Sequence, residues 1–352
     1  MKTILKKIDI DNFTLEELDQ AATLLRKGGL VAFPTETVYG LGANALDKDA
    51  SKKIYEAKGR PSDNPLIIHI SDKNDIKNLA KDIPDMAYQL ADVFWPGPLT
   101  MILKKKDIVP KETTGGLDTV AIRLPANPIA RELIAYSGVY VAAPSANKSG
   151  KPSPTQAEHV VQDLDGKIDM IIDGGKATLG LESTIIDLTG DLPMILRPGC
   201  ITSEMLERVV DHLVYDPAVL ATKPFSDVKP KAPGMKYRHY APEGNLTIYE
   251  GAMDNVINEI NKNAEEKCRK GHTVGVIATD ETKALYRFGI IKTIGSRKDE
   301  ASIAAGLYQI LREFDELKTE YIYSESFTDN PLGQAIMNRL LKAAGYQIVK
   351  LS

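Results

Sequence analysis

The sequence predicts an α/β protein of two domains joined by a linker, and three observations support this prediction. The chain has 352 residues, which is more than one hydrophobic core usually serves. Short β-branched runs alternate with segments of helical periodicity, a pattern typical of α/β folds. Residues 213–244 show neither period and are rich in proline. They therefore indicate a linker between a first domain at 1–212 and a second at 245–352.

Composition and charge exclude several classes of protein. With 43% hydrophobic and 26% charged residues, the chain is not a largely disordered one. A net charge of −4 provides no global basic field that would draw it onto nucleic acid or a membrane, so any RNA contact would be local. Cys200 and Cys268 have no metal-ligand spacing, residues 1–25 hold no apolar run fit for a signal peptide, and no stretch approaches a membrane span. We expect a reduced, cytoplasmic protein.

The first predicted strand leads into an unusual polar segment. A capping box at Thr14–Glu17 opens a helix that ends at Gly28-Gly29, and residues 30–33 then form a buried strand. Hydroxyls, a carboxylate and a tyrosine follow in residues 34–42, where the strand ends and where α/β sheets bind ligands. Residues 40–45 match the G-x-G-x-x-A dinucleotide fingerprint, but the segment before them is too long for a tight turn and no acidic ribose partner follows. A dinucleotide site is therefore not expected.

A basic, turn-rich stretch at residues 58–65 separates a helix at 49–57 from a strand at 66–70. Glycine and proline stop the helix, so Lys58 and Arg60 are predicted to lie on a constrained loop. Such a pair suits a polyanion such as a nucleotide triphosphate, with lysine as a point charge and arginine as a fork. From these residues alone, a solvated loop with two surface cations is the favoured interpretation, since exposed lysine and arginine are the norm.

The rest of the first domain continues the alternation. Helices are predicted at 73–80, 85–94, 127–136 and 202–211, and strands at 99–103, 119–124, 139–143, 168–173, 184–188 and 193–197. Arg123 lies inside an apolar strand, so its guanidinium must reach the sheet edge or meet an anion.

Polar residues recur within or at the ends of these strands and on the basic loop. They are Thr35, Lys58, Arg60, His69, Arg123, Ser145, Asn147, Ser183 and Arg197. The set contains neither a Ser-His-Asp arrangement of recognisable spacing nor an H-E-x-x-H zinc motif. It suits electrostatic catalysis on an activated phosphate, in which positioning and charge neutralisation produce the rate.

The linker and the second domain differ sharply in character. Residues 233–242 combine tyrosines with lysine, arginine and histidine, which favours a lid over a nucleotide rather than a plain spacer. The second domain is predicted to be doubly wound, with strands at 245–250, 273–278, 290–294, 321–325 and 346–350 and helices at 253–270, 299–317 and 332–344. It has no Gly-rich phosphate loop, so a supporting or regulatory role is expected.

Four motifs together carry a family resemblance. They are Lys58-x-Arg60, Ser145-x-Asn147, the run Phe33–Leu41 and the linker run Pro233–Pro242. With these motifs the chain resembles, over essentially its whole length, the long-form threonylcarbamoyl-AMP synthases of the YrdC-like family. One departure is Ala232, where the family's linker commonly has serine before Pro-Gly.

The resemblance implies a YrdC-like twisted open α/β catalytic domain, a linker and a Rossmann-like second domain. It implies a nucleotidyltransferase that joins L-threonine, bicarbonate and ATP into threonylcarbamoyl-adenylate with release of pyrophosphate. Mg²⁺ would accompany the triphosphate and need few protein ligands. A separate transferase would use the product to modify tRNAs that read ANN codons, and a weak direct contact with tRNA is possible.

The resemblance also implies residue roles. Lys58 and Arg60 would be catalytic. L-threonine would be held by Thr35, His69, Arg123, Ala143 and Ser183, with Arg123 taking the carboxylate. ATP would be held by Lys58, Arg60, Ser62, Thr119, Ser145, Asn147, Ser153, Arg197 and Tyr240.

Two other functions stay open at this point. One is an RNA-binding module without catalysis, because YrdC-like domains carry a basic concave surface. The other is a carbamoyl-transferring enzyme, because related domains occur in hydrogenase-maturation proteins. Those proteins carry zinc-finger-like segments, which the two cysteines of this chain rule out.

Overall fold

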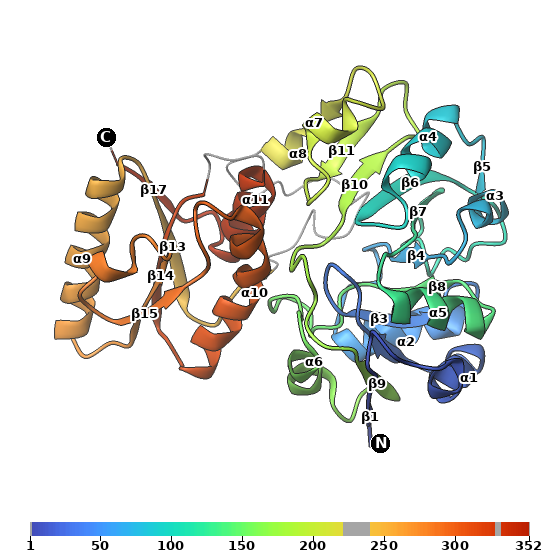
Figure 1. The fold of residues 1–352 in the computed structure, drawn as a ribbon, viewed down its shortest axis with the longest axis horizontal. Helices are drawn as coiled ribbons and strands as arrows, with labels where there is room; N and C mark the ends of the chain where they lie inside the picture. Colours follow the sequence, from blue (N-terminus) through green and yellow to red (C-terminus); the bar gives the residue numbers. More distant parts are fainter. Residues whose placement is uncertain (1, 221–239, 328–331, 352) are drawn as a thin grey trace.

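The computed structural model describes residues 2–220, 240–327 and 332–351 and shows two domains, each built on its own sheet (Figure 1). The predicted two-domain α/β architecture is confirmed. Among the described helices, none is both long and apolar enough to cross a membrane.

The first domain is built on a mixed sheet of 12 strands, in the order β1-β9-β2-β3-β8-β4-β7-β6-β10-β11-β12 with β5 paired to β6. Its strands are β1 (Ile4–Lys7), β2 (Val31–Phe33), β3 (Gly40–Asn44), β4 (Ile67–His69), β5 (Ala80–Lys81), β6 (Leu99–Lys105), β7 (Thr119–Arg123), β8 (Val141–Ala142), β9 (Met170–Asp173), β10 (Thr184–Asp187), β11 (Met194–Arg197) and β12 (Val214–Tyr215). Its helices are η1 (Leu15–Leu18), α1 (Asp19–Arg26), α2 (Lys48–Lys58), η2 (Lys73–Asp75), α3 (Ile76–Leu79), α4 (Asp85–Phe94), α5 (Pro128–Ser137), α6 (Ala157–Leu164), α7 (Ser203–Leu206) and α8 (Pro217–Leu220).

The second domain has a parallel five-stranded sheet in the order β15-β14-β16-β13-β17. Its elements are β13 (Asn245–Glu250), α9 (Met253–Arg269), β14 (Val274–Ala278), η3 (Lys283–Leu285), β15 (Ile290–Thr293), α10 (Glu300–Glu316), β16 (Tyr321–Glu325), α11 (Gly333–Ala343) and β17 (Ile348–Lys350). Figure 1 shows α9 on the outer face of this sheet and α10 and α11 on the face toward the first domain. The doubly wound prediction is therefore confirmed.

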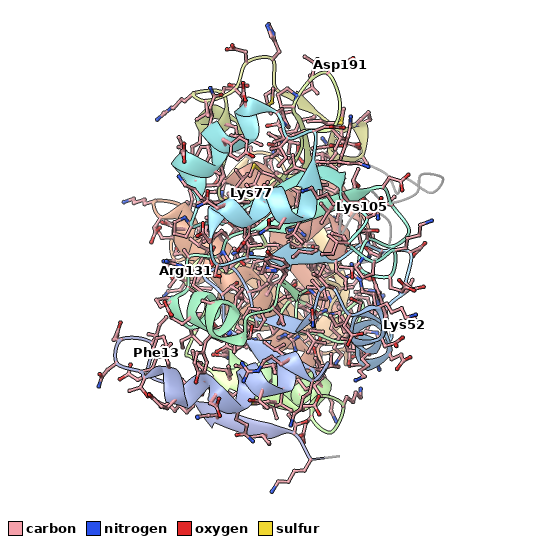
Figure 2. The ribbon with its side chains drawn as sticks, turned by 90° about the vertical axis from the view of Figure 1, so that its right-hand side faces the viewer. Phe13, Lys52, Lys77, Lys105, Arg131 and Asp191 are labelled. Carbon is pink, nitrogen blue, oxygen red and sulfur yellow. The ribbon has the colours of Figure 1, made fainter. Side chains whose placement is uncertain are left out.

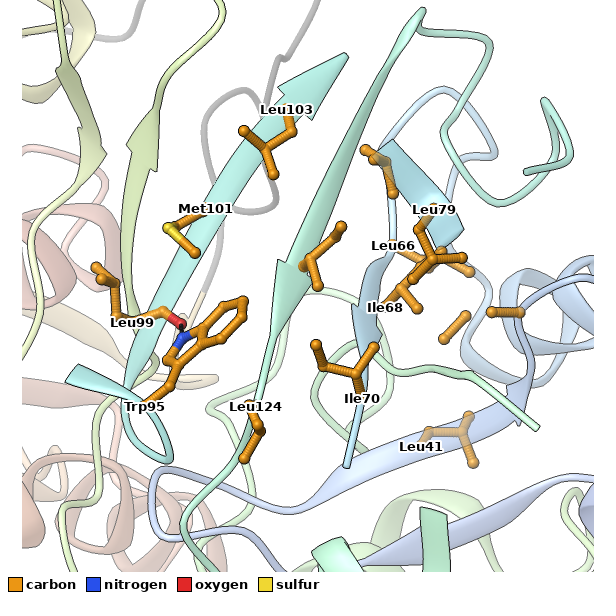
Figure 3. Packing of buried hydrophobic residues seen from close by; sticks show 14 of the residues in the cluster. Leu41, Leu66, Ile68, Ile70, Leu79, Trp95, Leu99, Met101, Leu103 and Leu124 are labelled. Carbon is orange, nitrogen blue, oxygen red and sulfur yellow. Dashed lines mark hydrogen bonds between the residues drawn. The ribbon is translucent and has the colours of Figure 1, made fainter. Parts of the chain in front are cut away.

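The hydrophobic core of the first domain lies between the sheet and its helices. Ile68 of β4, Met101 of β6 and Leu79 of α3 are buried in one cluster (Figure 3). Ile122 of β7 and Leu90 of α4 are buried in the same cluster. Burying a side chain of this size stabilises the fold by about 1.5–3 kcal/mol. This cluster holds the central strands in place, and those strands carry the polar residues at their ends.

The face of the first domain that points away from the second domain carries charges of both signs. Figure 2 shows Lys52, Lys77, Arg131 and Asp191 spread over this face. Lys52 is paired with Asp49 at 3.0 Å in an exposed ion pair. Exposed pairs of this kind contribute little to stability.

The sequence prediction missed the strands β1, β3, β5 and β12 and the helices α6, α8 and η3. Strand β3 begins inside the segment that was expected to be a loop. Its two glycines made a strand there hard to expect, since glycine weakens strands. In the sheet Gly42 faces β2, where an added Cβ would come within 2.7 Å of the Phe33 ring and of Val141. Glycine therefore permits the close approach of these strands.

Two boundaries also differ from the prediction. The helix expected at 202–211 is only the short α7, and turns follow in which the backbone N–H of Val210 donates to Leu206 O at 2.9 Å. The β-branched Val209 and Val210 disfavour a longer helix. Strand β12 then pairs with β11, so the sheet of the first domain continues past residue 212. Most of the predicted lid, residues 233–239, lies outside the described residues.

Candidate active site

One pocket of about 700 Å³, counting its open mouth, lies in the first domain. The predicted residues that line it are Thr35, Lys58, Arg60, His69, Arg123, Ala143, Ser145, Asn147, Ser183, Arg197 and Tyr240. The structure therefore brings together most of the residues that the sequence singled out.

The sheet register explains why these residues meet. His69 of β4 pairs with Arg123 of β7, Arg123 with Thr100 of β6, and the adjoining strand β10 brings Arg197 of β11 into the same row. Side chains in one such row point to the same face of a sheet. Five neighbouring strands thus present two arginines, a histidine and a threonine hydroxyl along one line.

Arg123 meets an anion, one of the two alternatives for a cation inside an apolar strand. Its guanidinium donates to Glu36 Oε1 at 2.6 Å and to Thr37 Oγ1 at 2.9 Å, and only 4% of the residue is exposed. Glu36 and Thr37 were not predicted as site residues. The signal for them was the carboxylate and second hydroxyl in the Pro-Thr-Glu-Thr run. A substrate carboxylate at Arg123 would share the guanidinium with Glu36.

Thr35 stiffens the turn that carries Glu36. Its hydroxyl donates to Val38 O at 2.6 Å and lies 2.8 Å from the hydroxyl of Thr37. Both threonines are buried. Local bonds of this kind fix a turn, so the partner of Arg123 is held on a rigid support.

Lys58 does not lie on the loop, contrary to the prediction. It is the last residue of α2 and only 2% exposed, and Gly59 at φ +60° turns the chain after it. Its Nζ donates to Ser145 O and to Asn147 O, each at 2.5 Å. Burial, reinforced by Arg60, lowers the pKa of Lys58 well below its ordinary value. Lys58 therefore anchors the Ser145–Asn147 segment to the helix.

The Ser-Ala-Asn segment is locked by its own side chains as well. Ser145 Oγ donates to Asn147 Oδ1 at 2.5 Å, and Asn147 Nδ2 donates to Lys148 O and Lys151 O, each at 2.9 Å. These bonds place a hydroxyl and an amide beside Lys58 at the pocket wall.

Arg60 is the pocket cation that the protein engages least. Among the described residues, the guanidinium makes only long contacts, 3.5 Å to Asn64 O and 3.3 Å to Pro65 O. Its buried Nε has no hydrogen-bond partner among the described residues. Burial lowers the pKa of Arg60 to about 10, so the side chain stays charged at neutral pH. An anion in the pocket would supply the missing partner.

Ser183, directly before β10, and Arg197, the last residue of β11, form a hydrogen-bonded pair. Arg197 donates to Ser183 O at 3.0 Å and to Ser183 Oγ at 3.1 Å, and the same hydroxyl lies 2.7 Å from Thr100 Oγ1. Both residues are buried. Each therefore fixes the orientation of the other.

Three predicted residues lie outside the pocket lining. Ser62 is exposed on the loop after Arg60, and Thr119 begins β7 at the end opposite Arg123. Ser153 is fully buried and donates to Glu182 Oε1 at 2.6 Å. Glu182 itself lines the pocket and was not predicted, although it directly precedes Ser183. Any contact of Ser62, Thr119 or Ser153 with ATP remains a prediction.

The described part of the chain holds no group of three or more His, Cys, Asp or Glu side chains placed to bind a metal ion. Within the pocket, Glu182 already accepts bonds from Ser153 and Tyr308. That Mg²⁺ enters together with the nucleotide remains a prediction.

His69 gives a pH prediction. It is 3% exposed, and burial, with Arg123 beside it, lowers its pKa to about 3 from an ordinary 6.5. Between those values the unfolded chain binds a proton that the folded one excludes, so the stability due to this group is complete above pH 6.5 and declines toward pH 3. The loss is at most about 1.4 kcal/mol per pH unit.

Urea unfolding of wild type and His69→Gln from pH 7 to 4 tests this. We expect the variant to have a shallower loss of stability. Burial also lowers the pKa of His159, to about 4. His159→Gln is therefore the matched comparison, and it should remove a separate part of the fall in stability with decreasing pH. Identical slopes for His69→Gln and wild type would contradict a buried, neutral His69.

Comparison with known proteins places the chain in a family. Residues 23–199 match the Sua5/YciO/YrdC family, described as "Telomere recombination", and residues 201–345 match "Threonylcarbamoyl-AMP synthase, C-terminal domain". The threonylcarbamoyl-AMP synthase of Bacillus subtilis is 50% identical over 95% of this chain and 94% of that protein. The one from Pyrococcus abyssi is 50% identical over 94% of this chain and 95% of that protein.

A solved structure agrees over the full length. The crystal structure of P. abyssi Sua5 complexed with L-threonine has a TM-score of 0.94 and 47% identity, and covers 99% of this chain and 100% of that one. This match confirms the predicted YrdC-like first domain and Rossmann-like second domain. The chain therefore belongs to the Sua5/YciO/YrdC family, in the long form that carries the C-terminal domain of the threonylcarbamoyl-AMP synthases.

Proposed function

We propose that the chain is an L-threonylcarbamoyladenylate synthase, a nucleotidyltransferase that converts L-threonine, bicarbonate and ATP into threonylcarbamoyl-AMP and pyrophosphate. One observation supports this most strongly: Lys58, Arg60, Arg123 and Arg197 line a single pocket. A pocket lined by four basic side chains suits an anionic substrate such as a triphosphate.

The pocket divides into two halves in this proposal. Arg123 takes the threonine carboxylate, and Thr35, His69, Ala143 and Ser183 surround the rest of the amino acid. Lys58, Arg60, Ser145, Asn147 and Arg197 face the nucleotide, with Ser62, Thr119, Ser153 and Tyr240 completing its site. The relative whose structure was solved with L-threonine supports the first half.

The proposed reaction has two steps. The threonine amine combines with bicarbonate to give a carbamate, with loss of water. A carbamate oxygen then attacks the α-phosphorus of ATP, the bond to the β-phosphate oxygen breaks, and pyrophosphate leaves. Lys58 and Arg60 stabilise the charge on the phosphates, which is the main way in which proteins accelerate this kind of transfer.

Mg²⁺ would arrive with ATP and help to neutralise the pyrophosphate. The product would pass, in the cytoplasm, to a separate transferase that modifies the adenine beside the anticodon in tRNAs reading ANN codons. With a net charge of −4, a direct contact with tRNA would be local and weak.

Product identification tests the proposal. The full chain is incubated with MgATP, L-threonine and ¹³C-bicarbonate, and threonylcarbamoyl-AMP is detected by mass spectrometry. We expect a ¹³C-labelled adenylate together with pyrophosphate, and neither when threonine is omitted. Pyrophosphate release that ignores threonine would contradict the proposal, and RNA binding without any adenylate would favour the binding-module alternative.

Tyr240 gives a prediction about the predicted lid. It is 6% exposed and lines the pocket, its ring lies 5.2 Å from that of Tyr308, and the next residue donates from its N–H to Gly150 O at 3.0 Å. Removing the ring opens the nucleotide side to water. We expect Tyr240→Ala to raise the ATP Kd and lower product yield, each by about tenfold.

Calorimetry with ATP and the product assay measure these effects. The control is Tyr88→Ala, because Tyr88 is 42% exposed on α4 and distant in sequence from every pocket residue. An ATP Kd for Tyr240→Ala equal to that of wild type would show that the linker only tethers the domains.

A further inference from the structure

The second domain contacts the first through α10 and α11 (Figure 1). Several of these contacts are made to residues of the first domain that do not line the pocket. Arg312 of α10 donates to Pro152 O at 2.5 Å and to Asp163 Oδ2 at 2.7 Å, and Gln334 of α11 accepts from Tyr215 at 3.0 Å. Such contacts hold the domains together but do not touch the lining of the pocket.

Glu182 is different because it belongs to the pocket lining and is 7% exposed. Tyr308 of α10 lies with its hydroxyl 3.0 Å and 2.8 Å from the two carboxylate oxygens of Glu182. Arg339 of α11 donates from Nε to Glu182 Oε2 at 3.1 Å. Two side chains of the second domain thus hold a carboxylate of the first domain's pocket.

Arg339 also joins two segments of the site. It is fully buried, and its remaining nitrogens donate to Glu182 O at 3.3 Å and to Pro198 O. Glu182 directly precedes Ser183, and Pro198 directly follows Arg197. One guanidinium therefore spans the segments that carry the bonded Ser183–Arg197 pair.

These segments have little room to shift. An added Cβ at Gly199 would come within 2.8 Å of Glu182 O and within 2.6 Å of the backbone nitrogen of Thr184. A change in the position of Glu182 would therefore be passed to Ser183 and Arg197. The charge of Arg339 also balances that of Glu182. Without it, the carboxylate would face Arg197 and compete with a phosphate.

We propose that Tyr308 and Arg339 of the second domain are positioning residues for the first domain's pocket, and that they act through Glu182 on Ser183 and Arg197. This inference rests on the proposed function. It gives the second domain a specific task, since it completes the threonine and nucleotide sites from outside the catalytic domain.

The test compares full-length Tyr308→Phe, Arg339→Met, Arg339→Lys, Glu182→Gln and the double variant Glu182→Gln/Arg339→Met. We expect Arg339→Met to lower kcat/KM by between about tenfold and a hundredfold, the usual effect of small displacements in a site. Arg339→Lys should recover part of the loss, because an ammonium can still reach the carboxylate. The double variant should be no worse than the poorer single variant, because both changes break the same contact.

Arg312→Met is the matched control, since it removes an arginine of the same domain that is also buried and also bridges the two domains. It should lower the melting temperature yet leave both KM values within about twofold. If Arg339→Met does not fold, Tyr308→Phe tests the inference instead, because it removes only a hydroxyl and leaves the ring against Tyr240. That variant should lower kcat/KM by about threefold to tenfold.

The Kd values for ATP and threonine, measured by calorimetry, separate this inference from the proposed function, because binding needs no turnover. A wild type that binds both ligands but forms no adenylate would contradict the function, while weakened binding in Arg339→Met would still support the positioning role. Unchanged kcat/KM and Kd in Tyr308→Phe and Arg339→Met would overturn the inference. So would losses that multiply when Glu182→Gln is combined with Arg339→Met.

Discussion

Replacing Arg60 by alanine is expected to lower threonylcarbamoyl-AMP formation by about two or more orders of magnitude, the usual effect of removing a preorganised electrostatic group. The guanidinium lines the pocket, and its hydrogen bonds to the described part of the chain are long, at 3.3 Å and 3.5 Å. Because few protein bonds are lost, thermal stability should hardly change. Pyrophosphate release and the melting temperature are the two measurements.

Lys58→Ala should lose activity to a similar extent but should also destabilise the fold. The lysine Nζ holds Ser145 O and Asn147 O, and without it two buried carbonyls lose their donor. The cost of such a loss is about 1–3 kcal/mol per group. Lys52→Ala, on the exposed face of the same helix, is the control and should resemble wild type. Near-wild-type pyrophosphate release from Arg60→Ala would remove this residue from the catalytic machinery.

The contrast between these two cations shows where sequence reasoning stopped. Alternation of strands and helices predicted both sheets, and polar residues at strand ends predicted most of the pocket lining. Burial of Lys58 was not predicted, because it depends on a segment almost ninety residues away that folds back over the end of α2. A local pattern does not contain a contact of that kind.

The failure to predict two glutamates as site residues has a similar explanation. Glu36 and Glu182 both lie in segments that drew attention for their hydroxyls, and an exposed carboxylate is the ordinary expectation for glutamate. Their importance depends on Arg123 for one and on Arg339 for the other. The second of these partners is in the other domain, where no catalytic motif was visible. Only the packing of α11 against the first domain makes it part of the site.

The other large effect concerns the choice of amino acid. We expect valine to be a poorer substrate than threonine by several orders of magnitude in kcat/KM. Valine has nearly the shape of threonine but lacks its hydroxyl. When valine occupies a site built to hydrogen-bond that hydroxyl, the buried polar groups of the site stay unpaired. The walls proposed for this half of the pocket include Thr35, His69 and Ser183, which are all at most 3% exposed.

Serine provides the counterpart, because it keeps the hydroxyl and loses one methyl group. That loss is worth only about 1–3 kcal/mol, so serine should react between about tenfold and two-hundredfold more slowly than threonine and faster than valine. Adenylates of all three amino acids are separable by mass, so competition in one reaction mixture gives the ratios directly. The order threonine, serine, valine requires polar recognition of the side chain. If valine instead matched threonine, shape alone would select the amino acid, and the assignment of Thr35, His69 and Ser183 to the threonine half of the pocket would be wrong.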